Sequence, residues 1–529
     1  MISSTPGTTI IGAIDQGTSS TRFTVYSSTG EMLVSHQVPV KRSTPHPGWI
    51  EQDPLEIIGS VGTCMDKVTK KLQTIGRSAS DVIAIGITNQ RETLVVWEKG
   101  SGLPLYNAIV WCDNRNADVV NDLISKYGAN YFQKKTGLTL SPYFTATKLL
   151  WLRQNVPAVQ AALDNNTCQI GTIDTWITWC LTRGNTFVTD VTNASRTFLM
   201  DINRLEWDNE LLQIFGIPKK CLPKIHSSAE IYGRVTEEYG PYEGVAISGM
   251  LGDQQASLVG THCIQQGTAK ITYGTGCFLL YNTGEKPIFS DKGLITTVGY
   301  KFGKKAPTFY ALEGSVATCG AAVQWLGDIF GKGESVHELA ASVKNSGGVY
   351  FVPAFSGLLC PHWKPDARGC FLGLTGYSSR GHIARAVLEG IAFQAMDVLN
   401  VTDSPLTEVR VDGGLSRSDL LIQFQADLLE IDVKRAANVE ATSRGAAIAA
   451  AHGIGLHGAG IVHNEEGCTV FKPKMQQKER ARRTKMWRKA IQRSMDWFEP
   501  EEEDYDAEGT ERDENIDNLE NSENETKET

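Results

Sequence analysis

The chain has 529 residues, of which 41% are hydrophobic and 21% are charged. This mixture is ordinary for globular proteins and excludes collagen-like, disulfide-scaffold and wholly disordered chains. Single hydrophobic cores stop growing near ~250–300 residues, so the length predicts about two large domains or more. Apolar runs stay well short of the ~18–20 residues that cross a bilayer, and we therefore expect no membrane span.

The formal net charge of −9 is concentrated at one end of the chain. Residues 499–529 contain 15 acidic and 2 basic side chains, a net charge of −13, which leaves +4 on the other 498 residues. Few large apolar residues occur in this segment, so it is predicted to be a disordered acidic tail. The nearly neutral remainder indicates no nucleic-acid partner.

Eleven cysteines are scattered along the chain without a C-x-x-C pair. An odd, dispersed set is typical of reduced thiols rather than of a disulfide framework or a zinc site. The first residues carry no Lys or Arg ahead of an apolar strand, which argues against a secretory signal. We therefore expect a cytoplasmic protein.

Short apolar, β-branched runs near the start predict strands separated by polar turns. These strands span residues 9–14, 22–26, 32–40, 82–87 and 94–97. Between them, Asp53 and Pro54 are typical of a helix N-cap and the first helical residue. From Leu55 to Leu72 apolar residues recur every three or four positions, as in an amphipathic helix. Strands mixed with such helices predict an α/β fold.

A similar opening recurs about 240 residues later. The strand-like run 245–249 precedes a predicted polar turn at 252–257, and residues 271–276 form another predicted strand and turn. The spacing is too wide for a solenoid. It predicts two related α/β halves, with a boundary near residues 255–265.

The last part of the chain before the tail is basic. Residues 472–493 hold ten basic side chains and one acid, with Trp487, Ala490 and Ile491 at helical spacing. Charge runs usually face water, which favours a solvated helix docked on the body. A helix that binds an anionic surface is the alternative.

Three predicted strand ends carry glycine beside hydroxyl or carboxylate groups, in Asp15–Ser20, Gly274–Gly276 and Asp412–Gly414. Backbone N–H groups and hydroxyls can surround phosphate oxygens, and a carboxylate can reach a hard cation. Each segment alone could be a simple turn, but three from two halves favour a shared nucleotide cleft. Neither a G-x-x-x-x-G-K-[ST] loop nor a helix-opening G-x-G-x-x-G occurs, which disfavours P-loop and dinucleotide folds.

With these segments the sequence resembles the FGGY carbohydrate kinase family, over about residues 8–498. Asn89–Glu92 and Gly252–Gln255 together resemble the members that act on glycerol. The other matching segments are residues 15–20, 86–93, 111–115, 143–148, 190–196, 273–278, 385–393 and 411–414.

The resemblance implies an α/β fold of two ribonuclease H-like (actin-like ATPase) domains with an interdomain cleft. The N-terminal domain is expected over residues 8–260 and the C-terminal domain over residues 261–498. The implied reaction is ATP-dependent phosphorylation of glycerol to sn-glycerol 3-phosphate, with an Asp general base and magnesium. Relatives form dimers and tetramers, so self-association is also implied.

Glycerol, a triol with one apolar edge, requires polar groups for its hydroxyls and a flat wall for its carbons. By resemblance the polar ligands are Arg91, Glu92, Tyr143, Asp253 and Gln254. The aromatic wall is Trp111 and Phe278. On sequence alone Arg91-Glu92 could be a surface ion pair, and Trp111 an ordinary core aromatic residue.

Asp253 is the implied catalytic residue. In phosphoryl transfer to an alcohol, an Asp near the hydroxyl orients it and accepts its proton. The alternative is an Asp that only caps the helix following it.

The resemblance also implies the nucleotide and metal ligands. The phosphates would be contacted by Thr18, Ser19, Ser20, Arg22 and Thr275. The rest of the nucleotide would be contacted by Gly320, Gln324, Gly414 and Ser418. The magnesium ion would be held by Asp15 and Asp253. Magnesium keeps several waters and takes few carboxylates, so two aspartates plus phosphates suffice. Relatives often place Asn at position 418, and Ser cannot supply an amide's paired donor and acceptor.

Two other functions stay open on the sequence. A kinase for another small polyol or sugar needs more room than Trp111 and Phe278 are expected to leave. An ATP-binding scaffold without catalysis is disfavoured by the joint presence of Asp15, Arg91, Glu92 and Asp253.

Bacterial relatives inhibited by fructose 1,6-bisphosphate carry an Arg-bearing loop before the second-half strand. The corresponding segment here, residues 237–244, has no Arg and carries additional acids. Because a doubly phosphorylated sugar is repelled by carboxylates, we predict that this sugar leaves the activity of the purified protein unchanged. Concentration-dependent inhibition in a steady-state assay would refute this expectation.

Overall fold

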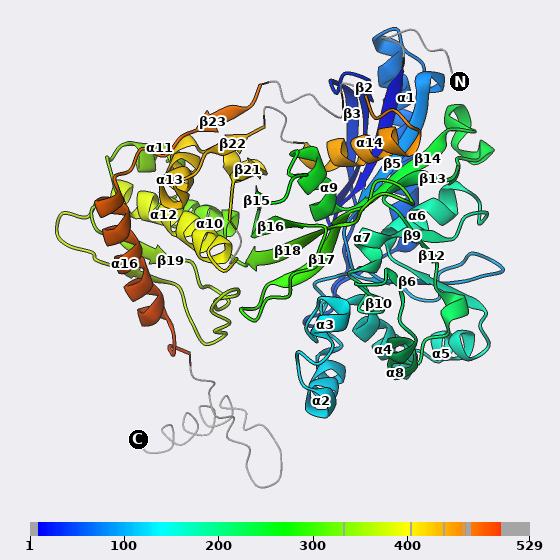
Figure 1. The fold of residues 1–529 in the computed structure, drawn as a ribbon, viewed down its shortest axis with the longest axis horizontal. Coiled ribbons are helices and arrows are strands. Elements are labelled where there is room, and N and C mark those ends of the chain that lie inside the picture. The colour runs from blue at the N-terminus through cyan, green and yellow to red at the C-terminus, as the bar shows by residue number, and fades with distance from the viewer. Residues whose placement is uncertain are drawn as a thin grey trace, which may run out of the picture.

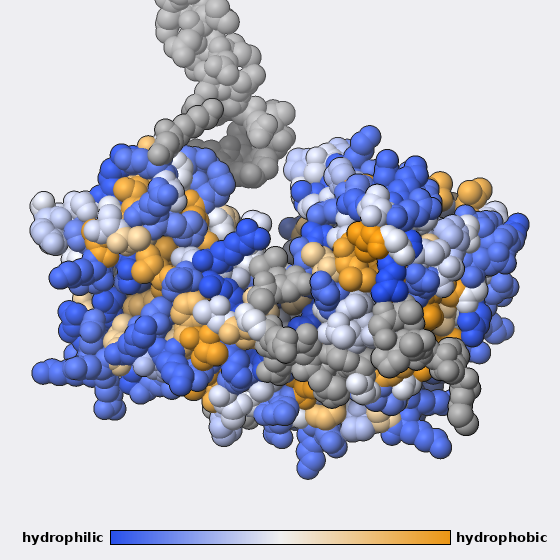
Figure 2. Space-filling model, turned by 90° about the horizontal axis from the view of Figure 1, so that it is seen from above, coloured by the Kyte–Doolittle hydropathy of each residue, from blue (hydrophilic) through white to orange (hydrophobic). Residues whose placement is uncertain are grey.

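The computed structural model describes residues 9–331, 334–402, 405–436, 440–458, 461 and 467–498. The predicted acidic tail, residues 499–529, lies outside the described residues. Two separate sheets organise the described chain, one on each side of the ribbon view (Figure 1). In the space-filling view the surface forms two masses with an indentation between them (Figure 2).

The first sheet has six strands in the order β13-β14-β5-β1-β2-β3. Central strand β1 pairs with β2 antiparallel and with β5 parallel, and β5 pairs with β14 parallel. The strands span Ile10–Gln16 (β1), Ser20–Ser27 (β2), Met32–Pro39 (β3), Val82–Asn89 (β5), Ala229–Arg234 (β13) and Ala246–Gly252 (β14).

The second sheet has seven strands in the order β17-β18-β16-β15-β21-β22-β23. Here β15 pairs with β16 antiparallel and with β21 parallel, and β21 pairs with β22 parallel. The strands span Thr268–Tyr273 (β15), Cys277–Gly284 (β16), Ile295–Tyr300 (β17), Phe309–Val316 (β18), Glu408–Asp412 (β21), Val433–Arg435 (β22) and Thr469–Phe471 (β23).

The two sheets have the same arrangement of strands, as expected for the two related halves that the sequence predicts. In each sheet a central strand has an antiparallel hairpin partner on one side and two successive parallel strands on the other. The β1–β2 hairpin therefore corresponds to the β15–β16 hairpin. The repeat thus pairs Asp15–Ser20 with residues 273–277 and not, as the sequence suggested, with the segment around Asp253.

The β1–β2 turn is shorter than predicted. Asp15 pairs with Arg22 and Gln16 with Thr21 in the antiparallel ladder, so only residues 17–19 form the turn. The turn is closed by a hydrogen bond from Gly17 N to Ser20 O at 2.9 Å. Asp15 is consequently held by strand geometry rather than by a loop.

Helix α1 (Pro54–Thr74) confirms the predicted cap, since Asp53 Oδ1 accepts a hydrogen bond from Leu55 N at 2.8 Å. Its predicted apolar face needs one correction, because Leu55 is 50% exposed whereas Ile57 is buried. Leu55 lies in the first turn of the helix, on its exposed side. The residues that face the core are Ile57, Val61, Cys64, Met65, Val68 and Leu72.

Within the segment 252–257, predicted as a turn, residues 253–257 are the start of a helix. Gly252 is the N-cap of α9 (Asp253–Gly260), and Asp253 is its first residue. Asp253 therefore points from the first turn of a helix that directly follows strand β14.

Helix α14 (Ala441–Gly453) belongs to the second half of the sequence, yet it packs against α9 and against strands β1, β5 and β14 of the first sheet. Glycines allow this close approach. A Cβ added at Gly86 would lie 2.0 Å from Ala446 O, and one at Gly445 would lie 1.8 Å from Ala256 O.

Helix α16 (Gln477–Ser494) is docked on the second lobe. The buried Trp487 ring stacks on Phe393 at a centroid distance of 5.0 Å, and Trp487 Nε1 donates to Asp397 Oδ2 at 2.7 Å. Arg483 Nη1 also donates to Glu389 Oε2 at 3.0 Å. The favoured interpretation of this basic segment, a docked helix with a solvated outer face, agrees with these contacts.

The other helices connect or cover the sheets. They span Ala117–Tyr127 (α2), Gln133–Thr136 (α3), Thr145–Asn155 (α4), Pro157–Asp164 (α5), Ile173–Leu181 (α6), Val191–Ala194 (α7), Asn209–Phe215 (α8), Gly320–Phe330 (α10), Val336–Ala341 (α11), Arg380–Leu399 (α12) and Asp419–Leu429 (α13). Short two-stranded sheets involve Glu51–Gln52 (β4), Val95–Glu98 (β6), Ala108–Ile109 (β7), Cys168–Gly171 (β8), Val188–Asp190 (β9), Met200–Asp201 (β10), Glu206–Trp207 (β11), Lys224–His226 (β12), Tyr350–Val352 (β19) and Cys370–Leu372 (β20). Within the described part of the chain, no helix is both long and apolar enough to span a membrane.

The packing of α14 predicts opposite effects for two Gly→Ala changes inside helices. Gly445→Ala should lower the free energy of unfolding by about 1–3 kcal/mol, because its Cβ would collide with backbone of α9. Gly59→Ala in α1, where a Cβ would meet nothing within 4 Å, should raise it by about 0.4–1 kcal/mol. Thermal and urea unfolding of both variants test this, and equal effects would contradict the packing argument.

Candidate active site

A buried cluster of four charged side chains lies where the two halves meet. Arg91, which follows β5 of the first sheet, donates from Nη1 and Nη2 to the two carboxylate oxygens of Glu313 at 2.5 and 2.9 Å. Arg196 Nε donates to Glu92 Oε1 at 2.6 Å, and Arg196 Nη2 lies 3.3 Å from Glu313 Oε1. None of the four side chains is more than 4% exposed. Glu313, on β18, thus binds arginines that come from the other half of the sequence.

Charge compensation keeps Glu313 ionised. Although burial alone would raise it, Arg196 and Arg91 hold the pKa of Glu313 at about 2. Burial raises the pKa of Glu92, against the opposing effect of the same two arginines. The surface ion pair considered for Arg91-Glu92 is excluded, because both side chains are buried and each is paired elsewhere.

Asp253 is joined to the cluster and also reaches the surface. Its Oδ1 atom lies 3.2 Å from Arg91 Nε, and its side chain is 28% exposed. Burial raises the pKa of Asp253, while the charges of Arg91 and Lys270 oppose the shift. Gln254 beside it accepts a hydrogen bond from Lys270 Nζ, which also donates to Thr272 Oγ1 at 2.7 Å.

Two predicted aromatic residues lie next to each other beside the cluster. The rings of Trp111 and Tyr143 are 5.2 Å apart at 54°, and the Arg196 guanidinium lies 5.9 Å from the Tyr143 ring centroid. Trp111 Nε1 donates to Thr18 Oγ1 at 2.9 Å, which links the wall to the β1–β2 turn. Trp111 is only half-buried, so it is not an ordinary core residue.

Phe278 lies on the second sheet, on the face that carries Glu313. Cross-strand partners in an antiparallel pair project to the same face, and Phe278 pairs with Ser315 while Leu280 pairs with Glu313. Phe278 is half-buried. The structure therefore brings Arg91, Glu92, Trp111, Tyr143, Asp253, Gln254 and Phe278 around one region.

On the first lobe, the phosphate-binding candidates form the β1–β2 turn. Thr18 and Ser20 are half-buried, and Ser19 is exposed. Ser20 Oγ accepts from Gln37 Nε2 at 2.6 Å. Arg22 is paired with Glu440 and donates to Gln37 Oε1 at 2.6 Å, so its guanidinium is already held in place.

Asp15 lies in β1 directly before this turn. Burial raises the pKa of Asp15 to about 7, with Arg22 opposing the shift and the charge of Asp253 adding to it. The two aspartates are thus close enough to interact. Among the described residues, no group of three or more His, Cys, Asp or Glu side chains could hold a metal ion alone.

On the second lobe, the equivalent turn is tied to the start of α10. Thr275 is exposed, and its carbonyl accepts from Cys319 N and Ala321 N at 3.0 and 3.1 Å. Gly320 N donates to Gly274 O at 2.9 Å, and a Cβ at Gly320 would lie 2.6 Å from that oxygen. The close contact explains the glycine at position 320.

The remaining nucleotide candidates surround the end of β21 and the exposed side of α10. Gly413 has φ +85°, and a Cβ there would lie 2.5 Å from Tyr273 O, whereas Gly414 faces open space. Gln324 is exposed and donates to Asp328 Oδ1 at 3.0 Å. Ser418 is the N-cap of α13, which gives this departure from the family pattern a structural role.

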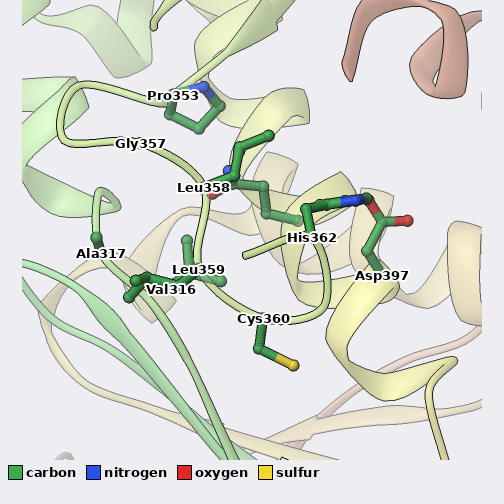
Figure 3. A pocket seen from close by; sticks show the side chains of 10 residues that line it. Val316, Ala317, Pro353, Gly357, Leu358, Leu359, Cys360, His362 and Asp397 are labelled. Atoms are coloured by element: carbon green, nitrogen blue, oxygen red, sulfur yellow. The ribbon is translucent and has the colours of Figure 1, made fainter. Parts of the chain in front are cut away.

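A separate small pocket lies beside the second-lobe turn, between the end of β18, the loop over residues 353–362 and α12 (Figure 3). His362 and Asp397 face each other on one side, with His362 Nε2 3.4 Å from Asp397 Oδ2. The lining residues do not include the predicted acceptor or nucleotide ligands.

Four functional candidates were missed by sequence reasoning: Arg196, Glu313, Lys148 and Lys270. Each is a charged side chain that is nine-tenths or more buried. Glu313 and Lys270 interrupt apolar strands. A charged residue within a buried strand is the sequence feature that could have identified them as functional candidates. For Lys148 and Arg196 only their place in matching segments pointed to a role.

The loop at residues 237–244 forms a short 3-10 helix over Glu237–Tyr242. Arg183, from elsewhere in the first lobe, pairs with Glu237 at 2.9 Å and with Glu238 at 3.3 Å. Two of the three acids in this loop therefore pair with an intramolecular cation.

Comparison with known proteins identifies the family of this site. Residues 10–260 match the N-terminal domain of the FGGY family of carbohydrate kinases, and residues 269–454 match its C-terminal domain. A protein from Dictyostelium discoideum named "Probable glycerol kinase" is 45% identical over 92% of this chain and 99% of its own length. A "Glycerol kinase" from Brucella anthropi is 45% identical over 93% of this chain and all of its own length.

Solved structures agree on the fold. Plasmodium falciparum glycerol kinase with ADP has a TM-score of 0.86 at 39% identity, covering 92% of this chain and 98% of its own. A ligand-bound xylulose kinase from Lactobacillus acidophilus has a TM-score of 0.80 at 23% identity, covering 92% and 97%, which supports the fold alone. With its two actin-like lobes and both domain matches, the chain belongs to the FGGY family of carbohydrate kinases.

Proposed function

We propose that this chain transfers the γ-phosphoryl group of ATP to glycerol, giving sn-glycerol 3-phosphate and ADP. The observation that carries the proposal is the position of Asp253. Its carboxylate is held by Arg91 at the buried junction of the halves, yet its side chain stays 28% exposed. Relatives named glycerol kinase match nearly the whole chain.

The acceptor side has the chemistry that a small triol requires. Arg91 offers guanidinium N–H donors, and Glu92 offers carboxylate acceptors. Both are fixed by Glu313 and Arg196, so little conformational entropy is lost when glycerol binds. Trp111 and Phe278 would supply the apolar surface for the carbon chain, and Tyr143, whose ring lies 5.2 Å from that of Trp111, would supply a hydroxyl.

Asp253 acts on the hydroxyl that attacks. Its raised pKa makes the carboxylate a better proton acceptor than an exposed aspartate. As the new O–P bond forms and the bond to the ADP oxygen breaks, the hydroxyl proton passes to Asp253. Most of the acceleration comes from positioning and from stabilising charge on the phosphoryl group.

The nucleotide phosphates would lie between the two corresponding turns, Thr18–Ser20 and Gly274–Gly276. Exposed hydroxyls and backbone N–H groups of both turns supply donors to phosphate oxygens. A Mg²⁺ ion fits Asp15 and Asp253, because two interacting carboxylates with raised pKa values are a hard-oxygen donor pair that a cation would relieve. When bound, the ion neutralises phosphate charge.

We also propose that the protein works in the cytosol and self-associates. All eleven cysteines are free thiols, as expected in a reducing compartment. Self-association rests on the family resemblance, and sedimentation velocity of the purified chain measures it directly.

The reaction is tested with purified protein, ATP and Mg²⁺ against a panel of acceptors. Glycerol should give the highest kcat/KM, with sn-glycerol 3-phosphate as product, because Trp111 and Phe278 are expected to leave too little room for a larger acceptor. Chelation of Mg²⁺ should abolish turnover. A pentose, gluconate or longer polyol that outperforms glycerol would replace this proposal with the alternative, a kinase for another polyol or sugar.

Asp253→Asn should lower kcat by about 10²–10⁴-fold, because the amide cannot accept the hydroxyl proton. Affinity for ATP, measured by calorimetry, should change little. The matched control is Asp118→Asn, which alters an exposed aspartate of α2. Full activity in Asp253→Asn would remove the general-base role and favour a purely helix-initiating Asp253.

A further inference from the structure

Lys148 is a fully buried cation without a carboxylate partner within ion-pair distance among the described residues. It lies on α4, one helical turn after the residue that opens the helix. Its Nζ atom donates to three backbone carbonyl oxygens: Pro142 at 2.6 Å, Tyr143 at 2.7 Å and Trp111 at 3.1 Å. An ammonium has three N–H donors, so each of them is used.

Two of the three carbonyls belong to the predicted acceptor residues Trp111 and Tyr143, and the third belongs to Pro142, directly before Tyr143. Trp111 is separated from Lys148 by 37 positions in the sequence, whereas Tyr143 lies just before α4. One side chain therefore joins two chain segments that carry the adjacent Trp111 and Tyr143 rings, 5.2 Å apart. The direct ring contact alone would allow the two segments to slide, because aromatic pairs tolerate a range of offsets.

The same helix also holds Glu92, a third residue of the proposed glycerol site. Thr145, in the first turn of α4, donates from Oγ1 to Glu92 O at 3.0 Å. Glu92 has a φ of 60°, an uncommon backbone conformation for a residue other than glycine. The start of α4 thus fixes the backbones of Glu92, Trp111 and Tyr143.

Burial lowers the pKa of Lys148 to about 7, and the carboxylates of Glu92 and Asp113 oppose this shift. A cation at such a position destabilises the fold unless its donors are satisfied. Deprotonation would leave two donors for three carbonyls. Burying an ammonium at this position carries a desolvation cost. An apolar side chain could fill the same space without that cost, so packing alone does not explain a lysine here.

Resting on the proposed function, we infer that Lys148 is a positioning residue that sets acceptor affinity and selectivity by fixing Trp111 relative to Tyr143. It does not touch the acceptor itself, since its three donors are directed to the backbone. Neither nucleotide turn accepts a hydrogen bond from Lys148, and its connection to the β1–β2 turn is indirect, through Trp111 Nε1, which donates to Thr18 Oγ1.

The test is Lys148→Met in the full-length protein, with KM determined separately for glycerol and for ATP. The KM for glycerol should rise about ten-fold or more, because three carbonyls lose the ammonium donor, although Pro142 O keeps a hydrogen bond from Asn116 Nδ2 at 3.1 Å, and the wall loosens. The KM for ATP should stay within about two-fold. The preference for glycerol over longer polyols should fall, since a movable wall admits larger acceptors.

Two further variants make the outcome decisive. Lys148→Gln keeps two N–H donors and should give an intermediate KM for glycerol. Lys134→Met, the same change at an exposed lysine of α3, should leave both KM values unchanged. ATP binding by calorimetry shows that each variant is folded.

The inference is overturned if folded Lys148→Met keeps the wild-type KM for glycerol, or if both KM values rise together. It is also overturned if neither Lys148 variant binds ATP, because the side chain is then a general requirement for folding. Failure of the proposed function appears separately, as wild-type protein that does not phosphorylate glycerol. In that case the same comparison is made with the best acceptor of the panel.

Discussion

The bidentate pairing of Arg91 with Glu313 is the constraint on which the site depends. Removing two ions from water carries a large desolvation cost, which only close geometry and additional partners offset. Here the additional partners are Arg196 and Asp253, so the charges alternate in sign through the cluster. Because Glu313 comes from β18 and both arginines come from the first half, the acceptor residues can assemble only where the two lobes meet.

This arrangement separates two tasks in space. The charged cluster and the wall held by α4 present the acceptor, while the corresponding turns of the two sheets present hydroxyls and N–H groups for phosphates. Asp253 connects them, since it begins the helix that leaves the first sheet and contacts Arg91. Each lobe supplies one turn because each contains the same strand arrangement.

The sequence predicted much of this from local physics. The cap at Asp53, the strands of the first sheet and the glycine-bearing turns follow from residue types and spacing. Leu55 and the start of α9 were misassigned, because which face is buried and where a helix begins depend on the neighbouring sheet. Glu313 was missed because its arginine partners lie more than a hundred positions away. The roles of Asp253 and of the nucleotide ligands came from family resemblance and remain predictions.

The return of α14 to the first sheet has a consequence for biosynthesis. Strands β1, β5 and β14 are complete once residue 252 has been made, but the helix that packs against them ends at residue 453. At ~5–20 residues per second, the ribosome takes on the order of ten seconds or more to supply the missing helix. During that interval an apolar sheet face stays uncovered, which makes the nascent first lobe a substrate for chaperones and a poor candidate for expression as an isolated fragment.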